Sequence, residues 1–550
     1  MGENVSTFSK KIGYQFSRFR KFIGTFMKKK MGIAGTIIIG IFVFISIFAP
    51  FLAKYDPIRD KGLASARAAP SWLRYVPSYL GGNPMLTENF DLISNPDFNS
   101  NQSLQEWQIE ANSSLLTYEY VEDFGYSNSI GSIRFSYVRD ESTSPVNSTV
   151  IFCKKVTFPY TGPPGGFAGR IAIFMNGTNY ETWVFKRFIN ETTGEPYTLN
   201  VSAAYFYVPV KIELFMGYVG DVNWTIWPIP SLSVTGLTSD NVALEYTGKW
   251  ISSGSINHAI TQLNDMFRNK TGQDAPSTLF GGKSFPGDYF IGVKITFLDS
   301  DANAGKYVKT EFYIDDFGMR FLGTSWGLLG TDQHGRDIFS QLIYGSRLSI
   351  YVGLLSAFIS VFLGLIVGLL AGYLGRIVDE ILMRFTDMLL VIPTLPLLIV
   401  ISAVLGPSLE NLILLIGFLG WMSFARLVRS QVLTLKERPF VEAARAAGGG
   451  RLHILTAHIL PNVASLVYVS LATAVPGAIV SEAALAFLGF TDPWRLSWGK
   501  MLSDAQESAA WKNWWWVIPP GLCIAALSMA FIFLGYALDE VLNPKLRIRR

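Results

Sequence analysis

The stretch EAARAAGGGRLHILTAHILPN runs from Glu442 to Asn462 and lies between two long apolar runs of this 550-residue chain. Its first six residues favour a helix. Gly448 to Gly450 then end that helix, because a glycine can take the positive φ of a tight C-terminal cap. We expect a second short helix from about Arg451 to Leu460, ended by Pro461 and Asn462. The stretch therefore predicts a compact helix–turn–helix that projects from a membrane.

Six apolar runs of the chain are long enough to cross a hydrocarbon core of about 30 Å. The first run covers residues 33–53 and carries no charge until Lys54. The others lie near residues 348–372, 385–406, 411–427, 463–487 and 514–538. In the second run Gly364, Gly368 and Gly372 recur at every fourth position. This spacing of small residues permits close helix–helix approach, although ordinary glycine content is the alternative.

Composition agrees with a membrane protein. The chain is 49% hydrophobic and 16% charged, whereas soluble proteins average about 25% charged residues. The net charge of +4 is too small to suggest a nucleic-acid binder. Cys153 and Cys523 are the only cysteines, which excludes a disulfide scaffold and a cysteine-rich zinc module.

The flanking charges predict the orientation in the membrane. Residues 1–30 contain eight Lys or Arg and one acid, Glu3, which places the N-terminus in the cytoplasm. The first apolar run is too long for a cleaved signal peptide, so we expect an uncleaved anchor. Apolar residues at helical spacing between Ile12 and Phe26 predict an amphipathic helix on the inner leaflet, with a flexible basic tail as the alternative. The basic residues 541–550 predict a cytoplasmic C-terminal tail.

Residues 54–325 contain no spanning run and read as an extracellular β-rich domain. Residues alternate in the strand manner at 133–138, 170–175, 204–215, 290–297 and 308–314. We expect a β-sandwich there, and residues 95–98 with Trp107 and residues 312–317 resemble the first and last strands of jelly-roll carbohydrate-binding modules. The domain would dock a binding protein or hold a glycan, or only shield the surface. Possible N-glycosylation sequons begin at Asn101, Asn112, Asn147, Asn176, Asn190, Asn200, Asn223 and Asn269.

Two motifs suggest chemistry that their residues do not support. Gly282-Lys283-Ser284 lacks the earlier glycine of a phosphate loop, because position 277 is Ser. Asp332, His334 and Asp337 could be drawn as metal ligands, but we expect no metal site. Instead we expect Thr331 to cap a helix whose apolar face is Ile338, Leu342 and Gly345. Residues 326–347 would then be an external amphipathic segment.

Several fixed positions together resemble one known family. Glu442, Ala443, Ala444, Gly448, His458, Pro461 and Asn462 resemble the EAA loop of ABC importer permeases. Gly330, Thr331, Asp332, Gly335, Arg336 and Asp337 resemble the GTDxxGRD segment of the dipeptide/oligopeptide/nickel importers. Residues 344–347, 371–375, 487–490 and 497–499 also fit. The resemblance covers about 326–550 and the N-terminal anchor, and is closest to the C-type permease subunit. Residues 54–325 form an unusually large external insertion, and Gly449-Gly450 departs from the family pattern.

The resemblance implies a membrane all-α, MetI-like six-helix permease, with the external β domain inserted between the first and second membrane helices. The first helix would span 31–53 and the five-helix core 348–540. It implies no catalytic site and no cofactor in this chain, because partner ATPase subunits bind ATP and Mg²⁺. The partners would be a homologous second permease, two ABC ATPases docked at the 442–462 loop, and an external substrate-binding protein.

The resemblance favours uptake of dipeptides or oligopeptides across the cell membrane. An oligosaccharide importer of the same family is the first alternative. A membrane-anchored binding or receptor protein is an alternative of another class, against which the EAA-like loop argues. A secondary transporter is disfavoured because the spanning runs carry almost no ionisable groups; Asp387 and Glu482 lie near their ends.

Overall fold

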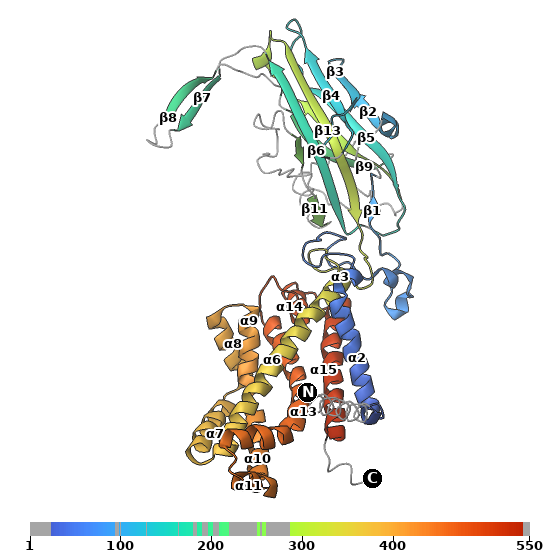
Figure 1. Cartoon of the computed structure of the whole chain (residues 1–550). Coiled ribbons are helices and arrows are strands. Elements are labelled where there is room, and N and C mark those ends of the chain that lie inside the picture. The colour runs from blue at the N-terminus through green and yellow to red at the C-terminus, as the bar shows by residue number, and fades with distance from the viewer. Residues whose placement is uncertain are drawn as a thin grey trace, which may run out of the picture. The chain divides into compact units, whose positions relative to one another are not determined.

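The computed structural model divides into a helical unit, residues 1–60 and 337–550, and a β unit, residues 61–336 (Figure 1). The β unit begins seven residues later and ends eleven residues later than the 54–325 limits that composition suggests. The structure describes residues 24–93, 98, 101–127, 129–162, 164–179, 184–189, 196–201, 208, 210–218, 250–252, 256–259 and 287–542. Residues 12–23 of the amphipathic segment predicted between Ile12 and Phe26 lie outside these residues, as do the basic tail from 543 and the Gly282-Lys283-Ser284 motif.

Long apolar helices dominate the described helical unit. Five segments are long and apolar enough to cross a membrane: 30–47, 338–374, 409–436, 451–487 and 514–542. A bent pair of helices makes a sixth if it is counted as one span. The principal helices are α2 (Lys30–Ile47), α3 (Ala49–Leu52), α6 (Ile338–Leu374), α7 (Arg376–Val391), α8 (Thr394–Leu405), α9 (Leu409–Gly420), α10 (Met422–Lys436), α13 (Leu460–Phe487), α14 (Trp498–Glu507) and α15 (Trp514–Leu542).

The run at 385–406, which we predicted as one span, is not one straight helix. It contains the end of α7 and all of α8, and the two helices meet at 89°. Pro393 lacks the N–H that would continue the hydrogen-bond ladder, and a proline disfavours helical backbone in the residue before it. Ile392 accordingly adopts an extended conformation, with φ −76° and ψ 127°.

The glycines of α6 pack as their spacing predicts. A Cβ at Gly364 would lie 2.7 Å from the Trp421 carbonyl oxygen, and one at Gly368 would lie 2.6 Å from that of Ala425. A Cβ at Gly372 would lie 2.7 Å from the Cβ of Val432. The backbone of α6 therefore lies close against α10, and the hypothesis of close helix approach is confirmed.

The start of α6 differs from our prediction. Its cap is Asp337, whose carboxylate accepts from the Ser340 N–H at 2.7 Å and from the Ser340 hydroxyl at 2.6 Å. Thr331 is not a cap: its buried hydroxyl donates to the Ser65 carbonyl at 2.6 Å and accepts from the Ala68 N–H at 2.9 Å. Because these partners are more than 260 positions away in sequence, local pattern does not reveal them. Residues 338–347 are the first turns of the unbroken helix α6.

Helix α14 lies in a segment that we predicted only as a loop. Ser497 caps it by accepting from the Lys500 N–H at 3.1 Å. The fully buried Trp498 donates its indole N–H to the Leu342 carbonyl of α6 at 2.9 Å. Gly499 allows this contact, since a Cβ there would lie 2.7 Å from the Cα of Ala483 in α13. Thus α14 is fixed to both long helices.

The β unit contains two antiparallel sheets with a shared core. Its larger sheet runs β10-β6-β13-β4-β3, with β1 on β13 and β11 on β6, and its smaller sheet runs β2-β5-β12-β9. A hairpin of β7 and β8 is separate. The strands are β1 (Phe90–Asp91), β2 (Gln108–Ala111), β3 (Leu116–Glu122), β4 (Gly131–Arg139), β5 (Ser148–Phe158), β6 (Gly166–Asn179), β7 (Val184–Ile189), β8 (Pro196–Val201), β9 (Val210–Tyr218), β10 (Trp250–Ser252), β11 (Ile256–Ala259), β12 (Gly287–Phe297) and β13 (Val308–Leu322).

Aromatic side chains from both sheets fill this core. Phe135 of β4 and Phe312 of β13 are buried together with Phe152 of β5. Trp107 stacks on Phe152 with a centroid distance of 4.1 Å and an interplanar angle of 11°. The prediction of a β-sandwich is confirmed to this extent, because both sheets bury their apolar faces against each other.

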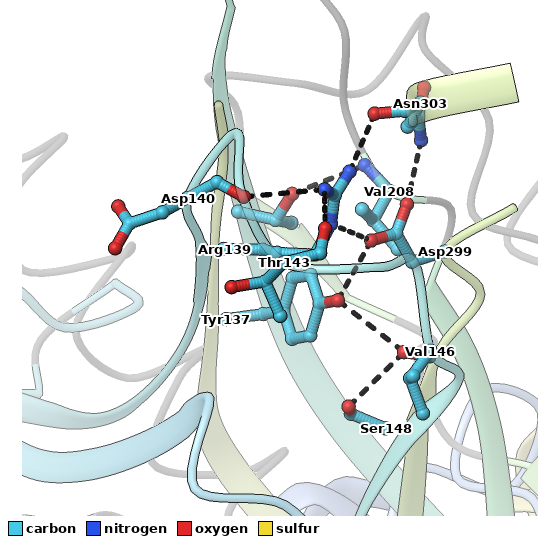
Figure 2. A network of polar contacts seen from close by, with 10 residues as sticks. Tyr137, Arg139, Asp140, Thr143, Val146, Ser148, Val208, Asp299 and Asn303 are labelled. Atoms are coloured by element: carbon cyan, nitrogen blue, oxygen red, sulfur yellow. Dashed lines mark hydrogen bonds and ion pairs between the residues drawn. The ribbon is translucent and has the colours of Figure 1, made fainter. Parts of the chain in front are cut away.

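One end of the sandwich buries an ion pair (Figure 2). Arg139 and Asp299 are both fully buried, and the guanidinium Nε donates to the carboxylate at 2.6 Å. Nη1 donates to the Thr143 carbonyl at 2.8 Å, and Nη2 donates to the Asn303 carbonyl at 2.7 Å. The Tyr137 hydroxyl donates to the same carboxylate at 2.8 Å. The network joins the loop after β4 to the loop after β12.

Candidate functional site

The loop between α10 and α13, which we call the 439–462 loop, begins with helix α11 (Pro439–Ala446). Pro439 takes the first position of this helix, where a missing N–H costs nothing. The helix ends in two bonds: the Gly448 N–H donates to the Arg445 carbonyl at 3.1 Å, and the Gly449 N–H to the Ala444 carbonyl at 3.0 Å. This pair of bonds is a Schellman cap, so the predicted glycine stop is confirmed.

The three glycines of this turn have different roles. Gly448 has a φ of +84°, with no atom within 4 Å of where a Cβ would stand. Its conformation alone demands glycine. At Gly449 a Cβ would lie 2.7 Å from the Ala444 carbonyl oxygen, so space is the constraint there. Gly450 has neither restriction: its φ is −66° and its surroundings are open.

The second limb of the loop is not the short helix that we predicted. Helix α12 (Arg451–His453) leads into a π-helix (Ile454–Ile459), which continues directly into α13. Pro461 therefore does not end a helix. A π-helical turn widens the backbone and gives the proline ring room where an α-helical carbonyl would clash. The Asn462 side-chain amide donates to the His458 carbonyl at 2.6 Å.

The 439–462 loop has a buried side and an exposed side. Val441, Ile454 and Ile459 are buried in a cluster with Val428 and Val432 of α10. Glu442, Ala443, Pro461 and Asn462 are exposed, as is the Gly448 turn. Leu452 is 74% exposed at the turn. The predicted residues therefore share one loop, which presents polar groups and a leucine while its apolar side chains join it to α10.

Two ion pairs join α10, the helix that leads into this loop, to α7, and we did not predict them from the sequence. Arg429 of α10 donates from Nη2 to the Asp379 carboxylate of α7 at 2.7 Å. One turn earlier, Arg426 donates to the Asp387 carboxylate, with an Nε–Oδ1 distance of 3.1 Å. The partners are 50 and 39 positions apart, so local sequence patterns do not reveal the pairing. The pairs fix α7 to the helix that carries the loop.

The residues of the second predicted motif form a tight loop in the β unit. The buried Asp332 carboxylate accepts from the His334 N–H at 2.8 Å, the Arg336 N–H at 3.0 Å and the Arg336 Nε at 2.6 Å. Gly330 and Gly335 supply positive φ angles of 72° and 70°. These contacts occupy Asp332 in holding the loop. Within the described residues, no group of three or more His, Cys, Asp or Glu is arranged to hold a metal ion.

Asn112 and Asn147 are the sequon asparagines whose side chains are described, and both are exposed. The Asn112 side-chain oxygen accepts from the Thr149 N–H at 2.7 Å. The side chains at Asn101, Asn176, Asn190, Asn200, Asn223 and Asn269 lie outside the described part of the chain. Glycosylation stays a prediction.

The 439–462 loop lies in a part of the chain that matches a known protein family. Residues 364–548 match the model of the binding-protein-dependent transport system inner membrane component, and residues 17–70 match the N-terminal TM domain of oligopeptide transport permease C. The dipeptide transport system permease protein DppC of Escherichia coli is 43% identical over 226 residues, which are 41% of this chain and 75% of that relative. The chain belongs to this family of ABC importer permeases.

Other relatives match a similar share of the chain. DppC of Bacillus subtilis is 37% identical to this permease over 220 residues, 40% of this chain and 68% of the relative. Among solved structures, the inward-facing MetNI methionine ABC transporter is 18% identical, covering 36% of this permease and 96% of that chain with a TM-score of 0.30. Family membership rests on the sequence matches. The two family matches leave residues 71–363 uncovered.

Proposed function

We propose that this permease imports dipeptides or oligopeptides, and that the 439–462 loop receives the movement that drives the import. The names of its relatives support the substrate: dipeptide permeases of Escherichia coli and Bacillus subtilis, and a di/tripeptide permease of Pseudomonas aeruginosa. The observation that carries the coupling role is the rigid Gly448 cap on an exposed loop. Its apolar underside packs against α10, so a displacement of the loop moves that helix with it.

The chain hydrolyses no ATP itself in this proposal. Two partner ATPases bind ATP and Mg²⁺, and the exposed residues Glu442, Ala443, Gly448, Pro461 and Asn462 dock on one of them. Ala444 and His458 support the docked surface from inside the loop. A homologous second permease completes the pore, and an external binding protein delivers the substrate. Each ATPase closure would move two such loops together and change the side of the membrane to which the pore opens.

The proposal also defines how the chain crosses the membrane. The bent pair α7–α8 counts as one span, so the chain crosses the membrane six times and both termini lie in the cytoplasm. The β unit is then extracellular, with the boundaries 61 and 336, and its two sheets form a jelly-roll-like domain. The positive-inside distribution supports this orientation, because six Lys or Arg lie between 426 and 451. A protease added to intact cells should cleave only within the β unit or short external loops.

A pair of glycine variants tests the coupling role. Gly448→Ala and Gly450→Ala each add one methyl group in open space, but only Gly448 has a positive φ. A non-glycine residue in that conformation costs about 1–2 kcal/mol. We expect Gly448→Ala to lower peptide transport and substrate-stimulated ATP hydrolysis, and Gly450→Ala to leave both unchanged. Glu442→Lys, which reverses the charge of the exposed acid, should lower both as well.

Substrate binding to the external binding protein should stay normal in all three variants, because the loop does not contact that protein. Wild-type transport in both Glu442→Lys and Gly448→Ala would overturn the coupling assignment. The substrate is tested separately with labelled peptides and labelled oligosaccharides in proteoliposomes that contain the whole complex. Uptake of oligosaccharides without peptides would overturn the peptide proposal and leave the coupling role intact.

We propose that the β unit docks the binding protein near the pore. Replacing residues 61–336 by a short flexible linker tests this role. The proposal predicts a higher substrate concentration at half-maximal uptake, with assembly of the complex preserved. Transport at a normal apparent affinity would show that the unit only shields the surface.

A further inference from the structure

One loop of the β unit exposes large apolar side chains in a way that a water-facing surface does not require. We call residues 73–85 the aromatic loop. Tyr75 is 76% exposed, Tyr79 85% and Leu80 66%, and Met85 is also exposed. Leu328, 55% exposed, adds to the same set. Single exposed apolar residues are ordinary, but a contiguous group of them marks an interaction surface.

The aromatic loop is held in this conformation by its own backbone. The Asn83 N–H donates to the Leu73 carbonyl at 3.0 Å, which closes the loop, and the Gly82 N–H donates to the Pro77 carbonyl at 3.2 Å. Gly81 turns the chain with a φ of +86°. Such a preformed loop presents its side chains without an ordering cost on binding.

The aromatic loop is joined to the segment that enters α6. The Trp72 indole N–H donates to the Leu328 carbonyl at 2.9 Å, and the Ser71 N–H donates to the Gly327 carbonyl at 3.0 Å. Leu328 is ten positions before Ile338, the first residue of a membrane-spanning helix, so covalent geometry keeps the two within about 35 Å. The chain therefore cannot carry this surface far from the membrane.

The charge of the segment fits the surface of a bilayer. Between Lys61 and Thr87 the sequence has three cations, Lys61, Arg67 and Arg74, and no acid. Acids flank this range at positions 60 and 88, and the second of them pairs with Arg74 at 3.8 Å, so Lys61 and Arg67 supply the local positive charge. Lys61 and Arg67 are exposed. Tyrosine and tryptophan are enriched at the level of lipid headgroups because one end of each ring is polar and the rest apolar. Basic residues beside them are attracted to lipid phosphates.

We propose that the aromatic loop inserts Tyr75, Tyr79 and Leu80 into the headgroup region of the lipid bilayer. The β unit would then contact the membrane through this loop. This inference rests on the proposed placement of the β unit outside the membrane, on the side where α6 begins. The occupant is lipid, because the chain tethers the loop near a bilayer and the local charge is positive.

A fluorescent probe that responds to polarity tests this surface in the full-length chain. Tyr79→Cys, with Cys523→Ala, is labelled with the probe and reconstituted into bilayers containing nitroxide-labelled lipids. Burial raises the pKa of the Cys153 thiol to about 11, so this native cysteine stays unlabelled at neutral pH. We expect a blue-shifted emission and loss of fluorescence to the nitroxide. Tyr118→Cys is the control, because Tyr118 of β3 is also an exposed tyrosine and should stay in water.

Leu80→Cys provides a second labelling site in case Tyr79→Cys does not fold. Equal emission and equal quenching at positions 79 and 118 would overturn the proposal. A blue shift at 79 that occurs in lipid-free detergent only when the binding protein is added would also overturn it, and would make the loop a protein-docking surface. The measurement needs no substrate, so failure of the peptide proposal would leave its outcome unaffected. Quenching only by nitroxide lipids in the cytoplasmic leaflet would instead overturn the proposed topology.

Discussion

Helix α6 and the core of the β sandwich bury opposite kinds of side chain. In α6 the buried positions include Gly364, Gly368 and Ser356, while Phe358 and Phe362 are exposed. In the sandwich core of the β unit, large aromatic residues such as Phe135, Phe152 and Phe312 lie inside. The hydrophobic effect favours burial of aromatic side chains in the sandwich, which lies in water. Lipid is as apolar as a phenylalanine side chain, so no such effect favours burying phenylalanine between helices in a membrane. Close backbone contact between small residues therefore does in the membrane what aromatic packing does in the sandwich.

The two units also differ in how far their ion pairs are buried. The β unit buries a complete ion pair, Arg139 with Asp299, and gives each of the two terminal guanidinium nitrogens a carbonyl partner. The pairs of the helical unit, such as Arg426 with Asp387, remain partly exposed. A fully desolvated charge depends entirely on its partners, whereas an exposed one can turn to water. Substitutions at the two kinds of position should differ strongly.

The largest effect should come from Arg139→Met, which leaves the Asp299 carboxylate buried without its cation. Breaking such a pair costs about 3–5 kcal/mol. We expect the β unit of the full-length chain to unfold at much lower urea, measured by loss of protease resistance. Arg320→Met is the matched control, since its partner Asp91 is exposed and such pairs contribute about 0–1 kcal/mol. Equal sensitivity in both variants would show that burial of the Arg139 pair has no special importance.

A smaller effect should follow from Gly368→Ala in α6. The added methyl group would lie 2.6 Å from both the Ala425 carbonyl oxygen and the Val428 Cβ. Overpacking of this kind costs about 1–3 kcal/mol. Gly477→Ala in α13 is the control, because a Cβ there has nothing within 4 Å. We expect the first variant to lower the melting temperature of the detergent-solubilised chain and the second to keep or raise it. The reverse order would contradict packing of α6 through small residues.

Local features of both units could be predicted from sequence. Three such features depend only on residues that are close in the chain: the Gly448 cap, the spacing of Gly364 and Gly368, and the alternating strands. Their patterns can therefore be recognised in the sequence. Thr331 was misassigned because its partner oxygen belongs to Ser65, far away in sequence. For the 439–462 loop, the prediction of the first helix and its glycine cap was correct, and the prediction of a separate second helix was wrong. Pro461 looks like a helix stop until the π-helix before it is known.

The smallest expected effect concerns a second buried carboxylate, Asp315 of β13, which accepts hydrogen bonds from several donors. Its side chain accepts from the Tyr126 N–H at 2.6 Å, the Ser129 hydroxyl at 3.2 Å and the Phe98 N–H at 3.4 Å. Burial raises the pKa of this carboxyl above its ordinary 3.8, although these hydrogen bonds oppose the shift. The folded chain thus binds a proton at Asp315 more tightly than the unfolded chain does.

The sign of the pH dependence follows from this difference. The contribution of Asp315 to stability is fully present below pH 3.8 and is lost as the pH rises through the raised pKa of the folded state. Asp315→Asn cannot titrate, so the free energy of unfolding of the β unit should lose this fall between pH 3.8 and neutrality. At neutral pH the variant should differ from wild type by only about 1 kcal/mol, the worth of one hydrogen bond. Urea unfolding across that range, with the exposed Asp91→Asn as control, measures both quantities. An unchanged pH slope in Asp315→Asn would mean that the hydrogen-bond donors of this carboxylate, and not its burial, decide its charge.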